Sequence, residues 1–178
     1  MRTELAKTLK RIALGATLAT LATSGFAATQ GTTGFTSTGD LDISLVVDDE
    51  VKISNLSDII LPGFTGTDVS GTSAACVYRN TGTSYNITAT GSGAANAFTL
   101  TDGTTTVNYS VTYDDGDGAD SLATGVALLA DNASDTNNDC ATGPGNNGSI
   151  EVTVTAANAA VLPAATYTGT LTLLVAPN

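Results

Sequence analysis

The sequence contains no histidine and no tryptophan, and only two basic residues, Lys52 and Arg79, stand after the first 27 positions. Histidine is the commonest general base and the usual partner of a serine or cysteine nucleophile, so hydrolytic triads are excluded. A pair of carboxylates can cleave a glycoside, but the acidic residues stand mostly in glycine-rich stretches without aromatic sugar platforms. We therefore expect a protein that is not an enzyme and that uses no cofactor.

Positive charge is concentrated at the N-terminus, where four of the six basic residues precede an apolar run, residues 12–22. That run is too short to span a bilayer, and a basic segment followed by a short apolar segment is typical of a secretory signal peptide. Gly25-Phe26-Ala27 satisfies the small-x-Ala rule for cleavage. We therefore expect residues 1–27 to be removed and the chain to be exported through the periplasm to the cell surface.

The chain that begins at Ala28 has 151 residues, a length that suits one domain. It carries two basic and 16 acidic residues, a net charge of −14. Phosphate backbones and anionic lipids would repel such a chain, so nucleic-acid binding and electrostatic membrane docking are excluded. No later apolar run approaches the length of a membrane span, so we expect no direct membrane insertion.

Cysteine is scarce, with only Cys76 and Cys140 in the sequence. In an exported protein two cysteines are expected to pair. Their wide spacing and the lack of histidine give little support to a metal-binding or catalytic thiol pair. The sequence therefore predicts one disulfide bond.

Threonine, valine, isoleucine, leucine and tyrosine alternate with period two through most of the mature chain, and clusters of glycine, asparagine, aspartate and serine separate these segments. This pattern predicts an all-β, Ig-like sandwich. The expected strands are residues 40–47, 51–54, 58–61, 73–79, 84–91, 96–101, 104–113, 121–130, 148–157 and 166–175.

Other segments have more specific signals. Asp102-Gly103 between two alternating flanks predicts a β-hairpin. The alanine-rich residues 155–161 predict a helical turn, limited by the nearby Pro163. Residues 114–120 and 131–148 are predicted to be loops from their composition.

The first of these loops is a weak candidate for calcium, because carboxylates on a flexible loop are the ligands that calcium prefers. Its carboxylates lack the EF-hand spacing and the closing glutamate, and acidic loops are more often solvated turns. We therefore assign no metal site and expect calcium binding to be weak or absent. The candidate residues are Asp114, Asp115, Asp117 and Asp120.

Near the mature N-terminus, residues 28–39 have too little apolar surface to fold alone, yet they lead into residues 40–48, where apolar side chains stand at alternate positions. Alternate residues of a strand share one face, which here carries Leu41, Ile43, Leu45 and Val47. The opposite face is mostly polar and carries Asp40, Asp42, Ser44 and Val46.

Three stretches carry a family resemblance. They are residues 39–49 (Gly-Asp-Leu-Asp-Ile-Ser-Leu-Val-Val-Asp-Asp), 76–91 (Cys-Val-Tyr-Arg-Asn-Thr-Gly-Thr-Ser-Tyr-Asn-Ile-Thr-Ala-Thr-Gly) and 164–177 (Ala-Ala-Thr-Tyr-Thr-Gly-Thr-Leu-Thr-Leu-Leu-Val-Ala-Pro). In their order and terminal positions they resemble pilins of the chaperone-usher pathway. The likeness is greatest to the alpha and archaic classes, which include the coli surface antigen fimbriae and the spore-coat-U-type pilins.

The resemblance implies an Ig-like domain, residues 49–178, that lacks its last strand. The resulting hydrophobic groove is filled first by a periplasmic chaperone and later, at an outer-membrane usher, by residues 40–48 of an identical subunit. The product would be a homopolymeric fimbrium that serves adhesion and biofilm formation. We expect the groove to run beside the C-terminal strand, along Tyr167, Gly169, Leu171, Leu173 and Val175, with a gap at Gly169 for a larger donor side chain.

Several alternatives remain open. About a dozen residues, Ala28–Gly39, precede the donor segment, which is more than the resemblance implies. These residues are either a flexible overhang, or they let Phe35 fill an additional socket of the groove. The register of the donor segment in the groove is therefore open. Residues 40–47 are alternatively the first strand of a complete domain. The whole chain is then a self-contained extracellular β-sandwich that binds a surface polymer or matrix, either with or without calcium. An aromatic content of 5% favours a shaft subunit over a sugar-binding tip.

Overall fold

The computed structural model describes residues 28–134, 138, 140 and 145–178. The predicted signal peptide and part of the predicted loop 131–148 lie outside the described residues. The chain divides into two units, Met1–Val46 and Val47–Asn178. Within the described part, no helix has both the length and the apolar character needed to cross a bilayer.

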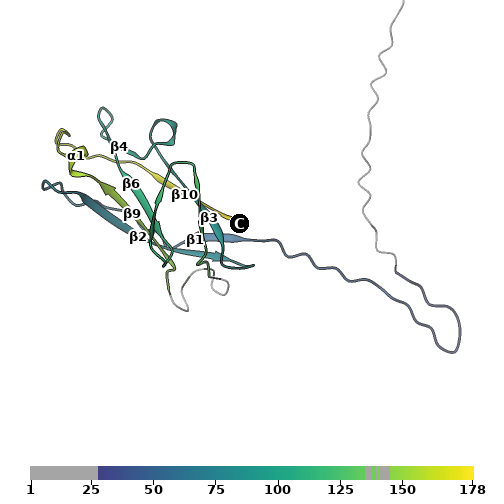
Figure 1. Ribbon diagram of the computed structural model, residues 1–178. Coiled ribbons are helices and arrows are strands. Elements are labelled where there is room, and N and C mark those ends of the chain that lie inside the picture. The colour runs from purple at the N-terminus through teal and green to yellow at the C-terminus, as the bar shows by residue number, and fades with distance from the viewer. Residues whose placement is uncertain (1–27, 135–137, 139, 141–144) are drawn as a thin grey trace, which may run out of the picture. The chain divides into compact units, whose positions relative to one another are not determined.

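The second unit is almost entirely β-structure (Figure 1). It contains one short α-helix, α1 (Ala156–Ala159), and one 3₁₀ turn, Ala94–Asn96. Its strands are β1 (Val51–Ser54), β2 (Val69–Arg79), β3 (Tyr85–Gly91), β4 (Thr99–Thr101), β5 (Thr106–Asn108), β6 (Ser110–Asp114), β7 (Ala119–Leu122), β8 (Ala127–Ala130), β9 (Gly148–Val154) and β10 (Leu171–Pro177).

The strands form two main antiparallel sheets and one small ribbon. The five-stranded sheet has the order β1-β2-β9-β6-β7, the three-stranded sheet has the order β10-β3-β8, and β4 pairs with β5. Figure 1 shows β2, β9 and β6 running together and β10 beside β3. The all-β sandwich predicted from the sequence is confirmed.

Period-two alternation places the core between the two sheets. In β3 the buried residues are Tyr85, Ile87 and Ala89, and in β9 the side chains of Ile150 and Val152 alternate with partly exposed neighbours. Burying an aliphatic or aromatic side chain of this kind stabilises the fold by about 1.5–3 kcal/mol. The inward faces of both sheets belong to one apolar cluster.

Two buried tyrosines link the sheets across this core. The hydroxyls of Tyr85 on β3 and Tyr113 on β6 lie 2.5 Å apart and share a hydrogen bond. Burial raises the pKa of both phenols, so both stay protonated near neutral pH. Gly148 lies directly against the Tyr113 hydroxyl, where a Cβ would clash, which explains a glycine at the start of β9.

The structure contains the predicted disulfide, Cys76–Cys140, which joins residues 64 positions apart. Cys76 is fully buried at the end of β2 that pairs with β1. Nearby, the Asn147 side chain accepts a hydrogen bond from the Val77 amide (2.8 Å) and donates one to the Val77 carbonyl (2.7 Å). The disulfide and the Asn147 side chain together hold Cys140 and Asn147, which precede β9, against β2.

Two local predictions are confirmed. The Asp102-Gly103 hairpin joins β4 to β5, and the Asp102 carboxylate accepts hydrogen bonds from the amides of Thr104 (2.8 Å) and Thr105 (2.6 Å). The alanine-rich turn is α1, which begins after Thr155, whose side chain accepts a hydrogen bond from the Asn158 amide.

Several strand predictions are wrong in their bounds. Residues 58–61 form no strand, because the Ser57 amide donates to the Ser73 hydroxyl (2.9 Å) rather than to a backbone ladder. The predicted strand 104–113 is interrupted at Tyr109, whose amide donates to the Phe98 carbonyl. The predicted strand 121–130 is interrupted by a turn at Gly125, where φ is +70°.

The C-terminal strand prediction also changes. The last strand begins at Leu171 rather than at residue 166, because Thr168 pairs only with Thr101 of the hairpin. Residues 41–47 form no strand in the described chain. Their pairing with another subunit stays a prediction.

We predict that the disulfide is a major part of the domain's stability. In the chain-entropy model, a bond that closes a loop of this length contributes about 4 kcal/mol. The variant carrying Cys76→Ala and Cys140→Ala should show that loss in denaturant unfolding, and reductant should destabilise the wild type but not the variant. Equal unfolding midpoints for oxidised and reduced wild-type protein would contradict this role.

Candidate functional site

Strand β10 has an unoccupied edge. All seven of its residues pair with β3, from Leu171 opposite Gly91 to Pro177 opposite Tyr85. No strand of the described chain pairs with its other side, since β10 stands at the end of its sheet. An edge of this kind presents backbone donors and acceptors in a row, which is a template for strand addition.

The side chains of β10 alternate as the sequence predicts. Leu171, Leu173 and Val175 are half-buried against the core, whereas Thr172 and Leu174 are exposed on the opposite face. The unoccupied edge therefore borders the apolar interior of the sandwich as well as the solvent.

Beside this edge runs a groove of about 1240 Å³. One wall is the irregular segment 56–64, and the other consists of residues 162–171 and Leu173. The floor is made of side chains from the core: Val69, Leu100, Val107, Tyr109, Ile150, Val152, Val154 and Ala159. Sites for small molecules are commonly about 300–1000 Å³ in volume, so this groove is larger than a typical small-molecule site.

The structure brings together four of the five residues predicted to form the groove edge. Tyr167, Gly169, Leu171 and Leu173 line the groove, whereas Val175 packs on the core further along β10. The proposed gap at Gly169 needs correction, because a Cβ at that position would lie 2.7 Å from the Thr99 carbonyl oxygen. Gly169 is thus required for close approach to β4.

Sequence reasoning missed the opposite wall. Ile59 and Leu61 alternate with exposed neighbours, which produced the wrong strand prediction, and both pack over Gly71 of β2. A Cβ on Gly71 would lie 2.8 Å from the Ile59 side chain, so the glycine lets this segment lie close to the sheet. Nothing in the sequence indicates that the segment lies across a groove from β10.

In the predicted donor segment the apolar side chains are exposed. The exposed fractions are 71% for Leu41, 89% for Ile43, 86% for Leu45 and 69% for Val47. Four apolar side chains at alternate positions without cover are unusual in a soluble chain and indicate a surface that is covered in another state.

The lead before this segment closes on itself within the first unit. Thr29 and Asp40 exchange two backbone hydrogen bonds of 2.9 and 3.0 Å. Phe35 lies in the loop between them and is fully exposed. The lead therefore contains a local turn that ends where the donor segment begins.

A polar cluster fixes the start of the sandwich unit. The Arg79 guanidinium donates to the Asp49 carboxylate at 3.1 and 2.6 Å and also to the backbone oxygen of Asn178 (3.2 Å). Asn80 exchanges hydrogen bonds with the backbone of Glu50 and donates to the Asp48 carbonyl. The Arg79 hydrogen bonds hold the pKa of Asp49 below its ordinary value. Residues 48–50 are therefore tied to the end of the domain where β10 finishes.

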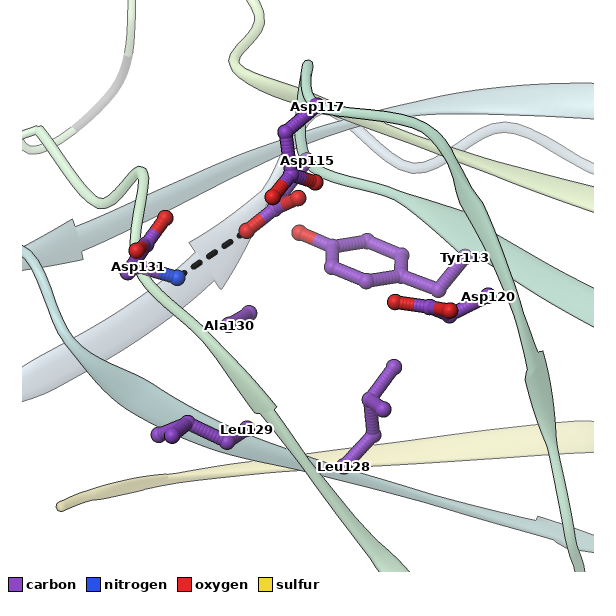
Figure 2. Close-up of a pocket in the computed structure, with 8 residues that line it drawn as sticks. All are labelled: Tyr113, Asp115, Asp117, Asp120, Leu128, Leu129, Ala130 and Asp131. Atoms are coloured by element: carbon purple, nitrogen blue, oxygen red, sulfur yellow. Dashed lines mark hydrogen bonds between the residues drawn. The ribbon is translucent and has the colours of Figure 1, made fainter.

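The weak calcium candidates are only partly brought together (Figure 2). Asp115, Asp117 and Asp120 line a pocket of about 110 Å³ together with Asp131, which was not predicted. The Asp114 carboxylate instead accepts hydrogen bonds from the amides of Gly116 and Gly118 in its own turn. No group of three or more carboxylate, cysteine or histidine side chains in the described chain is arranged to hold a metal ion.

Within this pocket the carboxylates interact mainly with one another and with backbone. Asp115 is buried and accepts a hydrogen bond from the Asp131 amide at 2.9 Å, as Figure 2 shows. A hydrogen bond and like-charge repulsion from Asp115 raise the pKa of Asp117. The pocket is thus an electrostatically unfavourable cluster at neutral pH.

Comparison with known proteins gives a match in fold. No protein-family model matches the chain, and no curated protein matches it. Among solved structures, a chain in a chaperone–tip adhesin complex of CFA/I fimbriae biogenesis is similar at 17% sequence identity with a TM-score of 0.50. The similarity covers 72% of this chain and 41% of that chain, so the protein spans well under half of its structural neighbour. The likeness supports the predicted Ig-like fold.

We predict that Asp117→Asn stabilises the protein at neutral pH. A carboxyl group whose pKa is raised by folding destabilises the native state above that pKa, and the penalty disappears as pH falls through it. The difference in melting temperature between variant and wild type should therefore be positive at about pH 7 and shrink toward about pH 3. Asp42→Asn, which removes the same charge outside the sandwich unit, is the control; a pH-independent difference for Asp117→Asn would contradict the mechanism.

We also predict no calcium-dependent stabilisation. The Asp114 and Asp115 carboxylates already accept backbone hydrogen bonds, so calcium would have to displace them. Melting temperatures with calcium and with chelator should agree. A chelator-reversible rise of several degrees that is lost in the Asp115→Ala, Asp117→Ala double variant would refute this prediction.

Proposed function

We propose that the protein is a structural subunit, not an enzyme, that polymerises into a bacterial surface fibre. Each subunit donates residues 40–47 to the groove of its neighbour, beside β10. The observation that carries the proposal is the apolar groove along an unpaired strand edge, in a chain whose own apolar alternating segment is uncovered.

The donor and the groove match in chemistry. The donor carries four aliphatic side chains on one face, and the groove is lined by the apolar side chains of Val107 on β5 and of Ile150, Val152 and Val154 on β9. Burying four aliphatic side chains at about 1.5–3 kcal/mol each contributes on the order of 6–12 kcal/mol. Ladder hydrogen bonds to β10 add to this, at about 0.5–1.5 kcal/mol each. These contributions oppose the entropy that is lost when the donor becomes ordered and the subunits associate.

The direction of the chain favours donation to a neighbour. Residues 48–50 are held at the end of the domain where β10 finishes. A donor segment that turned back into its own groove would therefore run parallel to β10. A segment from another subunit can enter from the opposite end and pair antiparallel, which is slightly more stable per residue.

The partners follow from the same exposed groove. An apolar groove with a bare strand edge aggregates if it is left open, so it needs temporary cover before assembly. We propose a periplasmic chaperone for that role and an outer-membrane usher as the site of exchange. The structural neighbour belongs to a complex of chaperone and tip adhesin, which supports chaperone-type partners and a surface location. Adhesion and biofilm formation are the roles that such a fibre would serve.

The segment 40–47 is tested by charge substitution. In Leu45→Asp, assembly would bury an unpaired carboxylate, which is penalised by several kcal/mol beyond the lost apolar contact. Fibres should be absent from electron micrographs, while the subunit still accumulates with its chaperone. The matched control is Ser44→Asp, which adds the same charge to the opposite face and should assemble.

A reciprocal change tests the groove. Leu173→Asp places the charge on the acceptor side and should block assembly in the same way, because Leu173 lines the groove. Leu45→Asp subunits that form fibres of normal length and normal resistance to denaturant would refute donation through this segment.

A further inference from the structure

The three-stranded sheet differs from the rest of the molecule in charge. The seven residues of β3, the four of β8 and the seven of β10 include no charged side chain. The five-stranded sheet, in contrast, carries Lys52, Arg79, Asp114, Asp120 and Glu151. The charge-free sheet belongs to a mature chain with a net charge of −14.

Its outer face is uncharged and open, with threonine and asparagine side chains between exposed leucine and alanine side chains. Residues directly opposite one another in an antiparallel pair share a face. Leu174 stands opposite Thr88, which stands opposite Ala127; Ala176 stands opposite Asn86, which stands opposite Leu129. Leu174 is 62% exposed and Leu129 is 58% exposed, and no charged residue separates them along these rows.

We infer that this outer face, defined by Thr172, Leu174, Ala176, Asn86, Thr88, Thr90, Ala127 and Leu129, is a lateral contact between copies of the protein in neighbouring fibres. Two copies with a large net negative charge repel one another wherever their charged surfaces meet. Contact through strands that carry no charge brings less repulsion than contact through the other sheet and buries leucine against leucine, although Leu129 also borders the pocket of Asp115, Asp117, Asp120 and Asp131. A second copy is thus the partner whose chemistry fits the face.

The size of the face decides when the contact forms. Three strands spaced about 4.8 Å apart and a length of seven residues, with a rise of about 3.3 Å per residue, give the face an area on the order of 300 Å². Stable interfaces bury about 800 Å² on each partner, so two free subunits should not dimerise through this face. Repetition along a fibre adds many weak contacts and makes association strong. The inference therefore rests on the proposed function, because it needs a polymer.

Addition of the proposed donor strand to β10 extends this face by one strand. The outward residues of the donor include Asp40 and Asp42, which would place two negative charges on the face beside β10. Screening of these charges and of the net charge by salt should strengthen lateral contact, because the Debye length falls from about 30 Å at 0.01 M to about 8 Å at 0.15 M ionic strength.

The test compares purified fibres of three variants by negative-stain microscopy and sedimentation over this range of salt. Wild-type fibres should associate side by side increasingly as salt rises. Leu174→Glu fibres should remain single at every salt concentration. Ser70→Glu is the matched control: it adds the same charge to an exposed position of β2 in the other sheet and should associate like the wild type.

Leu174→Thr serves as a second variant that is compatible with an exposed strand position and adds no charge; its fibres should associate less than those of the wild type. Single wild-type fibres at all salt concentrations, or equal association of Leu174→Glu and wild type, would overturn the lateral contact while leaving the polymer intact. A complete absence of fibres in the wild type would instead overturn the proposed function, and with it this inference.

Discussion

The free edge of β10 is the constraint on which the rest of the structure depends. Because β10 has a partner on one side only, the apolar row of Leu171 and Leu173 borders a groove instead of another strand. The groove is lined by core residues of the sandwich, among them Ile150 and Val152. The chain carries an uncovered segment of matching pattern ahead of the domain, and a free strand edge is a template for strand addition.

The polar cluster around Arg79 gives this arrangement a direction. Arg79 is one of two basic residues after position 27, and its guanidinium contacts both Asp49 and the last residue, Asn178. The start of the sandwich and the end of β10 thus lie at the same end of the domain. This placement favours the proposed head-to-tail polymer, since a donor segment that leaves this end would pair antiparallel with β10 only on another copy.

Much of the fold could be predicted because period-two alternation reports directly on which residues face the core. Alternation located the sandwich, the Asp102-Gly103 hairpin and the inward row of β10. The oxidising compartment expected for an exported chain, with only two cysteines present, predicted the pairing of Cys76 with Cys140. The misses have tertiary causes. Residues 58–61 alternate like a strand but lie over Gly71 without a ladder, and Tyr109 interrupts a strand because its amide bonds to Phe98. Two features come from segments that are distant in sequence, which local patterns cannot bring together. They are the groove wall formed by residues 56–64 and the Asp131 carboxylate beside Asp115.

The most direct test of the account is a density map of the native fibre at side-chain resolution. We expect density for a strand in the groove, antiparallel to β10 and continuous with residue 48 of the adjacent subunit. Its inward side chains should be Leu41, Ile43, Leu45 and Val47. A fibre in which the groove is empty, or is filled by residues 40–47 of the same subunit, would contradict it.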